Sequence, residues 1–209
     1  LAPAALAALP FKIPVAHIHG GELTEGAIDD ALRHSMTKLS HLHFAATQEY
    51  GRRLVQMGEE PWRVTISGAP SLDNLASVKR PTAAALESRF GLRVTPETLL
   101  VTFHPATLEY ENAERQAGEL MAALRASRRP VIRERIKRFM REESSAQAVE
   151  SLGTEGYFSV LALCAAMVGN SSSGLLEAPS FGLPVVNVGS RQHGRVRGVN
   201  VIDVGYGRE

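Results

Sequence analysis

The segment covering residues 169–192 constrains the fold most, because it combines a strand, a small polar loop, a helix and a second strand. An apolar run at 161–168 ends in the loop GNSSSG, and apolar residues resume directly after it. Such a loop leaves backbone N–H groups unpaired at a helix start, where the helix dipole also favours an anion. A second apolar run follows at 185–188. The segment therefore predicts a parallel α/β sheet that binds a phosphate at the carboxyl ends of its strands.

Polar side chains in the same segment indicate a nucleotide in place of a bare phosphate. Glu177 lies one turn beyond the loop, where a carboxylate would repel phosphate but can accept hydrogen bonds from vicinal ribose hydroxyls. Arg191, with Gln192 beside it, follows the strand at 185–188, at the edge where such sheets bind ligands. The simpler alternative is an ordinary strand, loop and helix in which Ser171 and Ser172 only cap the helix.

Composition excludes several classes of protein. The 209 residues, 44% of them hydrophobic, hold enough apolar material for one large or two small domains. The longest uncharged apolar stretch, 160–168, is too short to cross a bilayer, so we expect no membrane association. A net charge of +1 gives no electrostatic case for nucleic acid. The lone cysteine, Cys164, excludes an internal disulfide and a cysteine-cluster metal site, and it fits a cytoplasmic protein.

Apolar periodicity predicts alternating strands and helices along the chain. In the first part we expect the end of a helix at 4–9, a buried strand at 13–18, an amphipathic helix at 28–39 with Ile28, Leu32 and Leu39 inward, strands at 42–46 and 64–67, and a helix at 48–57. After a less regular passage at 73–91 we expect strands at 99–103, near 130–132 and at 148–151, and helices at 111–126, 135–141 and 157–162. The pattern predicts an α/β fold of two doubly wound units, residues 1–80 and 81–209, the first incomplete.

Two places suggest residues that the sequence does not record. The first unit has only three predicted strands and the chain begins in mid-helix, so we expect further strands before Leu1. A second gap is expected between Ile132 and Glu134, because a strand would run into a helix without Gly, Asn, Asp or Pro to turn the backbone.

A second dense segment, HIHGGELTEGAIDDALRH at 17–34, carries candidate acid–base groups. The strand ending at His19 would project His17 and His19 on one face, and Glu22 would follow at the strand mouth. On the next helix Asp29 and Arg33 are spaced i, i+4, so we expect them to share one side and to act with His19 and Glu22. His104, after the first strand of the second unit, is expected to face the interdomain cleft as a phosphate donor or proton carrier.

Other interpretations of these residues stay open at this point. Asp30 and His34, also spaced i, i+4, fit an ordinary surface pair. The pairs His17/His19 and His41/His43 could hold zinc, although the chain offers no fuller ligand motif and we expect no metal. His104 beside Pro105 could be a loop-packing residue.

Taken together, these segments resemble the UDP-N-acetylglucosamine 2-epimerase family, and HIHGGE with IDDALRH resembles its hydrolysing branch. The resemblance also covers the FHP strand end at 103–105 and ESLGTEGYFSVL at 150–161. It implies two Rossmann-like domains that face across a cleft in a glycosyltransferase-B arrangement, with UDP mainly on the second. It implies UDP contacts from the phosphate loop and the residues after it: Ser171, Ser172, Ser173, Gly174, Glu177, Arg191 and Gln192. A family aspartate before Leu1 and a loop after Val131 have no counterpart here.

The chemistry implied is anti elimination of UDP to a 2-acetamidoglucal, followed by hydration to N-acetylmannosamine or a 2,4-diacetamido-6-deoxy analogue, as in sialic-acid synthesis. His19, Glu22, Asp29, Arg33 and His104 are the catalytic candidates. We expect a small-molecule UDP-sugar as the partner, no cofactor, and a homo-oligomer, either a dimer or a tetramer. A non-hydrolysing epimerase, a UDP-sugar glycosyltransferase and a non-enzymatic nucleotide-sugar sensor remain as alternatives.

Overall fold

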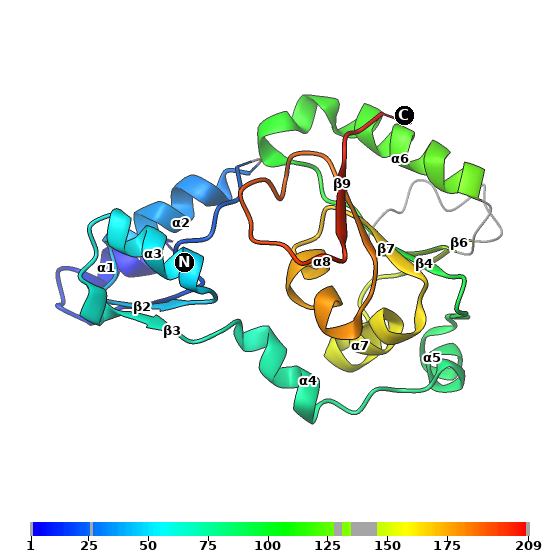
Figure 1. Ribbon diagram of the computed structural model, residues 1–209, viewed down its shortest axis with the longest axis horizontal. Coiled ribbons are helices and arrows are strands. Elements are labelled where there is room, and N and C mark those ends of the chain that lie inside the picture. Colours follow the sequence, from blue (N-terminus) through cyan, green and yellow to red (C-terminus); the bar gives the residue numbers. More distant parts are fainter. Residues whose placement is uncertain (1, 26, 128–130, 135–145, 208–209) are drawn as a thin grey trace.

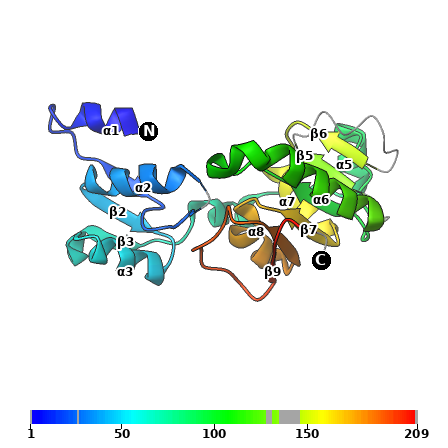
Figure 2. The same cartoon turned by 90° about the horizontal axis from the view of Figure 1, so that it is seen from above.

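A computed structural model describes residues 2–25, 27–127, 131–134 and 146–207. Within these residues the chain forms two parallel sheets, one of three strands in the order β1-β2-β3 and one of six in the order β6-β5-β4-β7-β8-β9. We call the three-stranded sheet with helices α1 to α3 the first unit, and the six-stranded sheet with its helices the second unit. Figures 1 and 2 show the two units side by side, the first in blue to teal and the second in green to red.

The first unit follows the predicted order of elements. It consists of α1 (Ala2–Ala8), β1 (Ala16–Ile18), α2 (Asp29–Lys38), β2 (Leu42–Ala45), α3 (Gln48–Gln56), a short 3-10 turn (Pro61–Arg63) and β3 (Val64–Ile66). Thr47 begins α3, since its side-chain oxygen accepts a hydrogen bond from the Tyr50 N–H at 3.3 Å. Ala45, Tyr50 and Leu54 form a small buried core between α3 and the sheet.

Two expectations for the first unit are wrong. The buried strand predicted at 13–18 is only β1, and Ile13 and Ile18 are both 53% exposed. Ile28 and Leu32 do not point inward, being 55% and 48% exposed, whereas Thr37 is fully buried. The reason is that α2 turns a polar face toward β1 and the loop after it, where Thr37 lies 3.4 Å from His17 and Arg33 donates to the His19 carbonyl. Periodicity identifies a helix with two distinct faces, but it does not decide which face a neighbouring polar loop will cover.

The second unit confirms the doubly wound fold. Its elements are α5 (Ala83–Phe90), β4 (Leu99–Thr102), α6 (Ala113–Ser127), β5 (Val131–Glu134), β6 (Ala146–Val149), α7 (Gly153–Leu163), β7 (Ala166–Gly169), α8 (Ser173–Leu176), β8 (Val185–Val188) and β9 (Val201–Val204). All neighbouring strands pair in parallel, and counted within this sheet their spatial order is 3-2-1-4-5-6. That order reverses between β4 and β7, and such reversal points are where doubly wound sheets bind ligands.

Helices cover both faces of the six-stranded sheet. Leu99 and Val101 of β4 belong to a buried cluster with residues of α6, whereas Leu100 belongs to a second cluster with residues of α5 and α7. This alternation follows from the two-residue period of a strand. Burial on both faces also explains why β4 and β8 are mostly apolar in the sequence.

Several boundaries differ from the predicted ones. The apolar run at 161–168 is not one strand, because α7 begins already at Gly153, ends at Leu163, and β7 starts at Ala166. The passage at 73–91 contains α4 (Asn74–Ser77) and α5, and the strand predicted at 148–151 is β6, shifted toward the N-terminus. The helix predicted at 135–141 lies outside the described residues. The expected gap near Ile132 stays a prediction.

Gly169 allows β7 to approach β4 closely at the reversal point. Its φ is +140°, and a Cβ placed on it would lie 1.9 Å from the Thr102 carbonyl oxygen. We predict that Gly169→Ala lowers the free energy of unfolding by at least about 2 kcal/mol, because strain and overlap with backbone cannot both be relieved. Urea denaturation measures this change.

Gly118, inside α6, is the matched control, since an added Cβ there meets nothing within 4 Å. Gly118→Ala should raise stability by about 0.5–1 kcal/mol, because alanine restricts the unfolded chain. Equal stability of the two alanine variants would contradict the close approach described for Gly169.

Candidate functional site

A cavity of about 550 Å³ opens at the carboxyl ends of β4 and β7, where the strand order reverses. Its walls come from the ends of β4 and β7, the start of α7 and the chain that leads into α4. The residues that line it are Ser71, Asn74, Thr102, His104, Ser151, Leu152, Gly153, Thr154, Tyr157, Phe158, Ser171, Ser172, Ser173 and Glu177. Five of the predicted site residues, His104, Ser171, Ser172, Ser173 and Glu177, therefore share one cavity.

The buried side chain of Asn170 holds His104 at the cavity. Its Oδ1 accepts a hydrogen bond from the His104 N–H at 2.7 Å, and its Nδ2 donates to the His104 carbonyl at 2.7 Å. Asn170 is fully buried, so both contacts form away from water and fix the chain after β4 against the chain after β7. The sequence pattern alone does not single out Asn170, although an amide offering one acceptor and two donors directly after an apolar run is a usable signal.

The serine loop differs in detail from the expected phosphate cradle. The Gly174 N–H donates to the Ser171 carbonyl at 3.2 Å, and the Ser173 N–H donates to the Ser171 hydroxyl at 3.3 Å. Those two amides already have acceptors, which leaves Ser171 and Ser172 as the amides to consider for a phosphate. The helix that follows, α8, has only four residues, so its dipole is small. Tyr157 donates its hydroxyl hydrogen to the Ser173 hydroxyl at 2.8 Å and is a second residue that sequence reasoning missed.

Arg191 and Gln192 lie behind the serine loop and are not among the residues that line the cavity. The Arg191 guanidinium and the Gln192 amide both donate to the carbonyl oxygen of Asn170, at 2.8 and 2.7 Å. Burial lowers the pKa of Arg191, and the charge of Arg195 adds to this effect. The two predicted side chains therefore support the loop from β8, at the expected edge of the sheet.

In the first unit, His19 and Glu22 form a close pair. His19 Nδ1 lies 2.6 Å from Glu22 Oε1, and since a carboxylate can only accept, the imidazole donates through Nδ1. His19 has a φ of +62°, a left-handed conformation that only a few per cent of non-glycine residues adopt. Its backbone is held by an N–H bond to the Phe44 carbonyl at 3.0 Å and by Arg33, which donates to the His19 carbonyl at 3.1 Å. Strained positions of this kind concentrate at functional sites.

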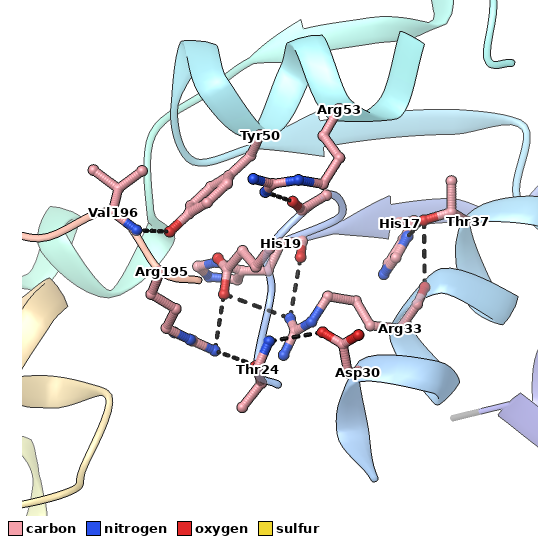
Figure 3. A network of polar contacts seen from close by, with 12 residues as sticks. His17, His19, Thr24, Asp30, Arg33, Thr37, Tyr50, Arg53, Arg195 and Val196 are labelled. Atoms are coloured by element: carbon pink, nitrogen blue, oxygen red, sulfur yellow. Dashed lines mark hydrogen bonds and ion pairs between the residues drawn. The ribbon is translucent and has the colours of Figure 1, made fainter. Parts of the chain in front are cut away.

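Glu22 is a buried carboxylate surrounded by cations. Its side chain is 2% exposed, and Oε2 lies 3.0 Å from Arg195 and 3.5 Å from Arg33. Burial alone would raise the pKa of Glu22, but the hydrogen bond from His19 and the charges of Arg195 and Arg33 outweigh it and lower the pKa. Figure 3 shows this network, with Arg195 reaching in from the second unit. Arg195 was not among the predicted residues.

The aspartates of α2 take different positions from those expected. Arg33 pairs with Glu22, and no ion pair joins the described side chains of Asp29 and Arg33. A joint role of these two residues with His19 and Glu22 stays a prediction. Asp29 is exposed at the first turn of α2, and its charge opposes the burial-driven lowering of the pKa of both Arg191 and Arg195. Asp30 lies 3.6 Å from His34, as a surface pair would, but it also accepts a 2.7 Å hydrogen bond from the Thr24 N–H.

The histidines proposed as rival zinc ligands have separate partners. His17 lies 3.4 Å from the Thr37 hydroxyl, and burial, together with the charges of His43 and Arg33, lowers its pKa to about 4. His43 contacts Glu59 at 3.1 Å, and His41 accepts a hydrogen bond from the Val15 N–H. Among the residues that the structure describes, no three His, Cys, Asp or Glu side chains are grouped to hold a metal ion.

In the same residues no helix has the length and apolarity needed to cross a membrane.

Comparison with known proteins assigns the chain to a family. The model of the UDP-N-acetylglucosamine 2-epimerase family matches residues 1–209. The chain belongs to this family. It is 36% identical over 210 positions to the GDP/UDP-N,N'-diacetylbacillosamine 2-epimerase (hydrolyzing) of Campylobacter jejuni, covering 93% of this chain and 55% of the relative. It is also 36% identical over 215 positions to the polysialic acid biosynthesis protein P7 of Escherichia coli, covering 96% of this chain and 54% of that protein.

Family members of known structure share the fold. The UDP-GlcNAc 2-epimerase of Methanocaldococcus jannaschii, solved in complex with UDP-GlcNAc and UDP, superposes with a TM-score of 0.76 at 17% identity, covering 97% of this chain and 61% of that chain. The arrangement of two α/β units is thus the glycosyltransferase-B type expected from the sequence. The chain spans about half the length of the curated relatives it matches.

The predicted site residues therefore fall into two groups. His104, Ser171, Ser172, Ser173 and Glu177 line the cavity of the second unit, with Gly174, Arg191 and Gln192 behind them. His19, Glu22 and Arg33 form a polar network in the first unit, with Asp29 exposed nearby. None of the residues that line this cavity belongs to the network of the first unit. Arg195 of the second unit connects to that network through Glu22.

The lowered pKa of Glu22 makes a prediction about stability and pH. A carboxyl group with a lower pKa in the folded state contributes stability above its unfolded pKa, about 4.3, and loses that contribution as pH falls through its folded pKa. At pH 7 the wild-type protein should therefore be more stable than Glu22→Gln. We expect the difference to shrink as pH is lowered below about 4. Urea denaturation at a series of pH values measures it.

Glu60→Gln serves as the control, because the Glu60 side chain is 57% exposed and pairs with Arg63 on the surface. Its effect should be small at every pH. A stability difference for Glu22→Gln that stays constant down to pH values near 3 would contradict an ionised, buried Glu22.

Proposed function

We propose that the full-length protein is a hydrolysing 2-epimerase that converts a UDP-linked 2-acetamido sugar into UDP and the free 2-epimer. The observation that carries the proposal is the cavity at the strand reversal of the second unit, where the serine loop, His104 and Glu177 meet. Membership of the family and the word "hydrolyzing" in the name of the Campylobacter relative support it. We further propose that the two domains are residues 1–80 and 81–209, with the boundary between α4 and α5.

In this proposal the cavity binds UDP. The Ser171 and Ser172 amides and hydroxyls, with His104, donate to the diphosphate, and Glu177 accepts hydrogen bonds from the ribose hydroxyls. Donors fixed in place cost little reorganisation when charge develops on a leaving group. The support that Asn170 gives to His104 suits this role, because it holds the backbone on which His104 stands.

The reaction has two stages. In the first, the bond between C1 and the UDP oxygen breaks, the C2 proton leaves, and a 2-acetamidoglucal forms with a double bond between C1 and C2. In the second, water adds a hydroxyl group to C1 and a proton returns to the opposite face of C2. The C2 proton is weakly acidic, so departure of UDP leads, and stabilising the diphosphate is the larger task.

Proton transfer is assigned to the first unit. His19, whose Nδ1 is fixed on Glu22, has Nε2 available for exchange, and the exposed Asp29 is the second candidate group. Inversion at C2 favours two groups on opposite faces of the sugar. The sugar itself is proposed to be N-acetylglucosamine or its 4-acetamido-6-deoxy analogue, since the family description and the name of the Campylobacter relative differ in this respect.

The elimination step predicts isotope incorporation. When the full-length protein turns over UDP-N-acetylglucosamine or UDP-N,N'-diacetylbacillosamine in D2O, the free sugar should carry deuterium at C2, because that proton is exchanged with solvent through the catalytic group. NMR of the product measures both the label and the configuration.

The same experiment separates the alternatives. A product that keeps hydrogen at C2 would overturn elimination. Release of an epimerised sugar still attached to UDP would indicate a non-hydrolysing enzyme. UDP formed only when an acceptor sugar is added would indicate a glycosyltransferase, and UDP binding without turnover would indicate a sensor.

Substitutions should separate the two groups of site residues. Glu177→Ala removes a ribose contact made in both the ground state and the transition state, so it should raise KM with little effect on kcat.

Asp29→Asn keeps size and polarity but removes the proton acceptor, so it should lower kcat by about 10²- to 10⁴-fold with UDP affinity unchanged. Steady-state kinetics and UDP titration measure both effects.

Glu155→Ala is the control for Glu177→Ala, because Glu155 is exposed on α7 and does not line the cavity. It should leave both constants unchanged. If Asp29→Asn weakens UDP binding and leaves turnover intact, Asp29 does not transfer the proton.

A further inference from the structure

A short segment of the second unit packs on the loop that carries the His19–Glu22 pair. This segment, residues 193–196, follows β8, and Figure 1 shows the chain between β8 and β9 extending toward the first unit. The Val196 N–H donates to the buried Tyr50 hydroxyl at 2.9 Å. Gly194 has a φ of +78°, and a Cβ on it would lie 2.7 Å from Cβ of Leu23. The contact is therefore close enough to require glycine.

Arg195 is the charged member of this segment. Its guanidinium lies 3.0 Å from Glu22 Oε2 and donates to the Thr24 hydroxyl at 3.3 Å, and its side chain is 8% exposed. The His19 ring holds the other oxygen of Glu22, at 2.6 Å. One carboxylate thus joins a histidine of the first unit to an arginine of the second (Figure 3).

We propose that Arg195 is a positioning residue, which completes the His19–Glu22 pair for proton transfer when the second unit lies against the first. This inference rests on the proposed function. Arg195 binds one carboxylate oxygen, so the other stays aimed at His19 Nδ1 and the ring keeps the tautomer that exposes Nε2. Acid–base chemistry in the first unit is thereby coupled to contact with the unit that binds the nucleotide.

The groups facing Glu22 explain why Arg195 matters for ionisation. The charged and titratable groups that face Glu22 come from five places in the fold. They are His19 of its own loop, His17 of β1, Arg33 of α2, Tyr50 of α3 and Arg195 of the second unit. Arg33 is more distant, at 3.5 Å, and also serves the His19 carbonyl. Without Arg195, burial opposes the ionised carboxylate with less compensation, so the pKa of Glu22 rises.

The test compares Arg195→Met, Arg195→Lys, Glu22→Gln and the double variant Arg195→Met/Glu22→Gln in the full-length protein, with a UDP-sugar as substrate. We expect Arg195→Met to lower kcat by about 10- to 100-fold, as for other residues that orient a catalytic group, with little change in KM. The acid limb of its kcat/KM profile should move to higher pH. Arg195→Lys should recover part of both effects, and the double variant should be no slower than Glu22→Gln.

Lys38→Met is the matched control, because Lys38 pairs with the buried Glu59 at 2.6 Å entirely within the first unit. It removes an equal charge but should change stability only, without moving the pH profile. Arg195→Met with an unchanged pH profile and only a lower melting temperature would overturn the positioning role. Rate losses that multiply in the double variant would do the same.

Failure of the inference can be told apart from failure of the proposed function. If the wild-type protein releases no UDP from either UDP-sugar, the proposed function fails and the positioning role fails with it. If the wild type is active and the Arg195 variants match it in rate and pH profile, only the role of Arg195 is overturned.

Discussion

The close parallel pairing of β4 with β7 is the constraint on which the rest of the second unit depends. The strand order reverses at this pair, the point where doubly wound sheets bind ligands, and the cavity lies at the carboxyl ends of these two strands. The approach is possible because Gly169 has no side chain to meet the Thr102 carbonyl. Both faces of the pair are covered by helices, so the strand ends that carry His104 and the serine loop stand on a rigid base.

The first unit follows a different principle. Its small apolar core lies under α3, while the side of α2 that faces β1 is polar and surrounds Glu22 with Arg33 and the loop. A buried carboxylate without partners would be strongly disfavoured, so the loop needs its cations to fold as it does. One of these cations, Arg195, is more than 170 residues away in the sequence. The first unit is therefore polar where it meets the second, and its conformation there depends on that contact.

The elements that the sequence predicted best are those whose pattern is complete within a few residues. The strand Val185–Val188 and the loop after β7 lie where expected, because an apolar run bounded by Pro or Gly depends little on the rest of the chain. The three serines of this loop line the cavity, and they could be predicted because the loop is defined by neighbouring residues alone. Asn170, Tyr157 and Arg195 were missed, since their roles depend on partners brought together only by tertiary packing. The buried pairing of Arg33 with Glu22 was also missed, since the i, i+4 spacing with Asp29 gives no sign of a partner on another element.

The backbone carbonyl oxygen of Asn170 accepts hydrogen bonds from the side chains of Arg191 and Gln192, which follow β8. The side-chain amide of Asn170 is hydrogen-bonded to the backbone of His104, which follows β4. Three consecutive strand ends of the sheet are thereby tied through a single residue. The floor of the cavity then behaves as one piece, because moving any of these loops breaks hydrogen bonds that are shielded from water. The wall formed by Ser71 and Asn74 belongs to the passage between the units and has no such tie to Asn170. Among the walls of the cavity, this passage is therefore one that can shift without breaking the hydrogen bonds of Asn170.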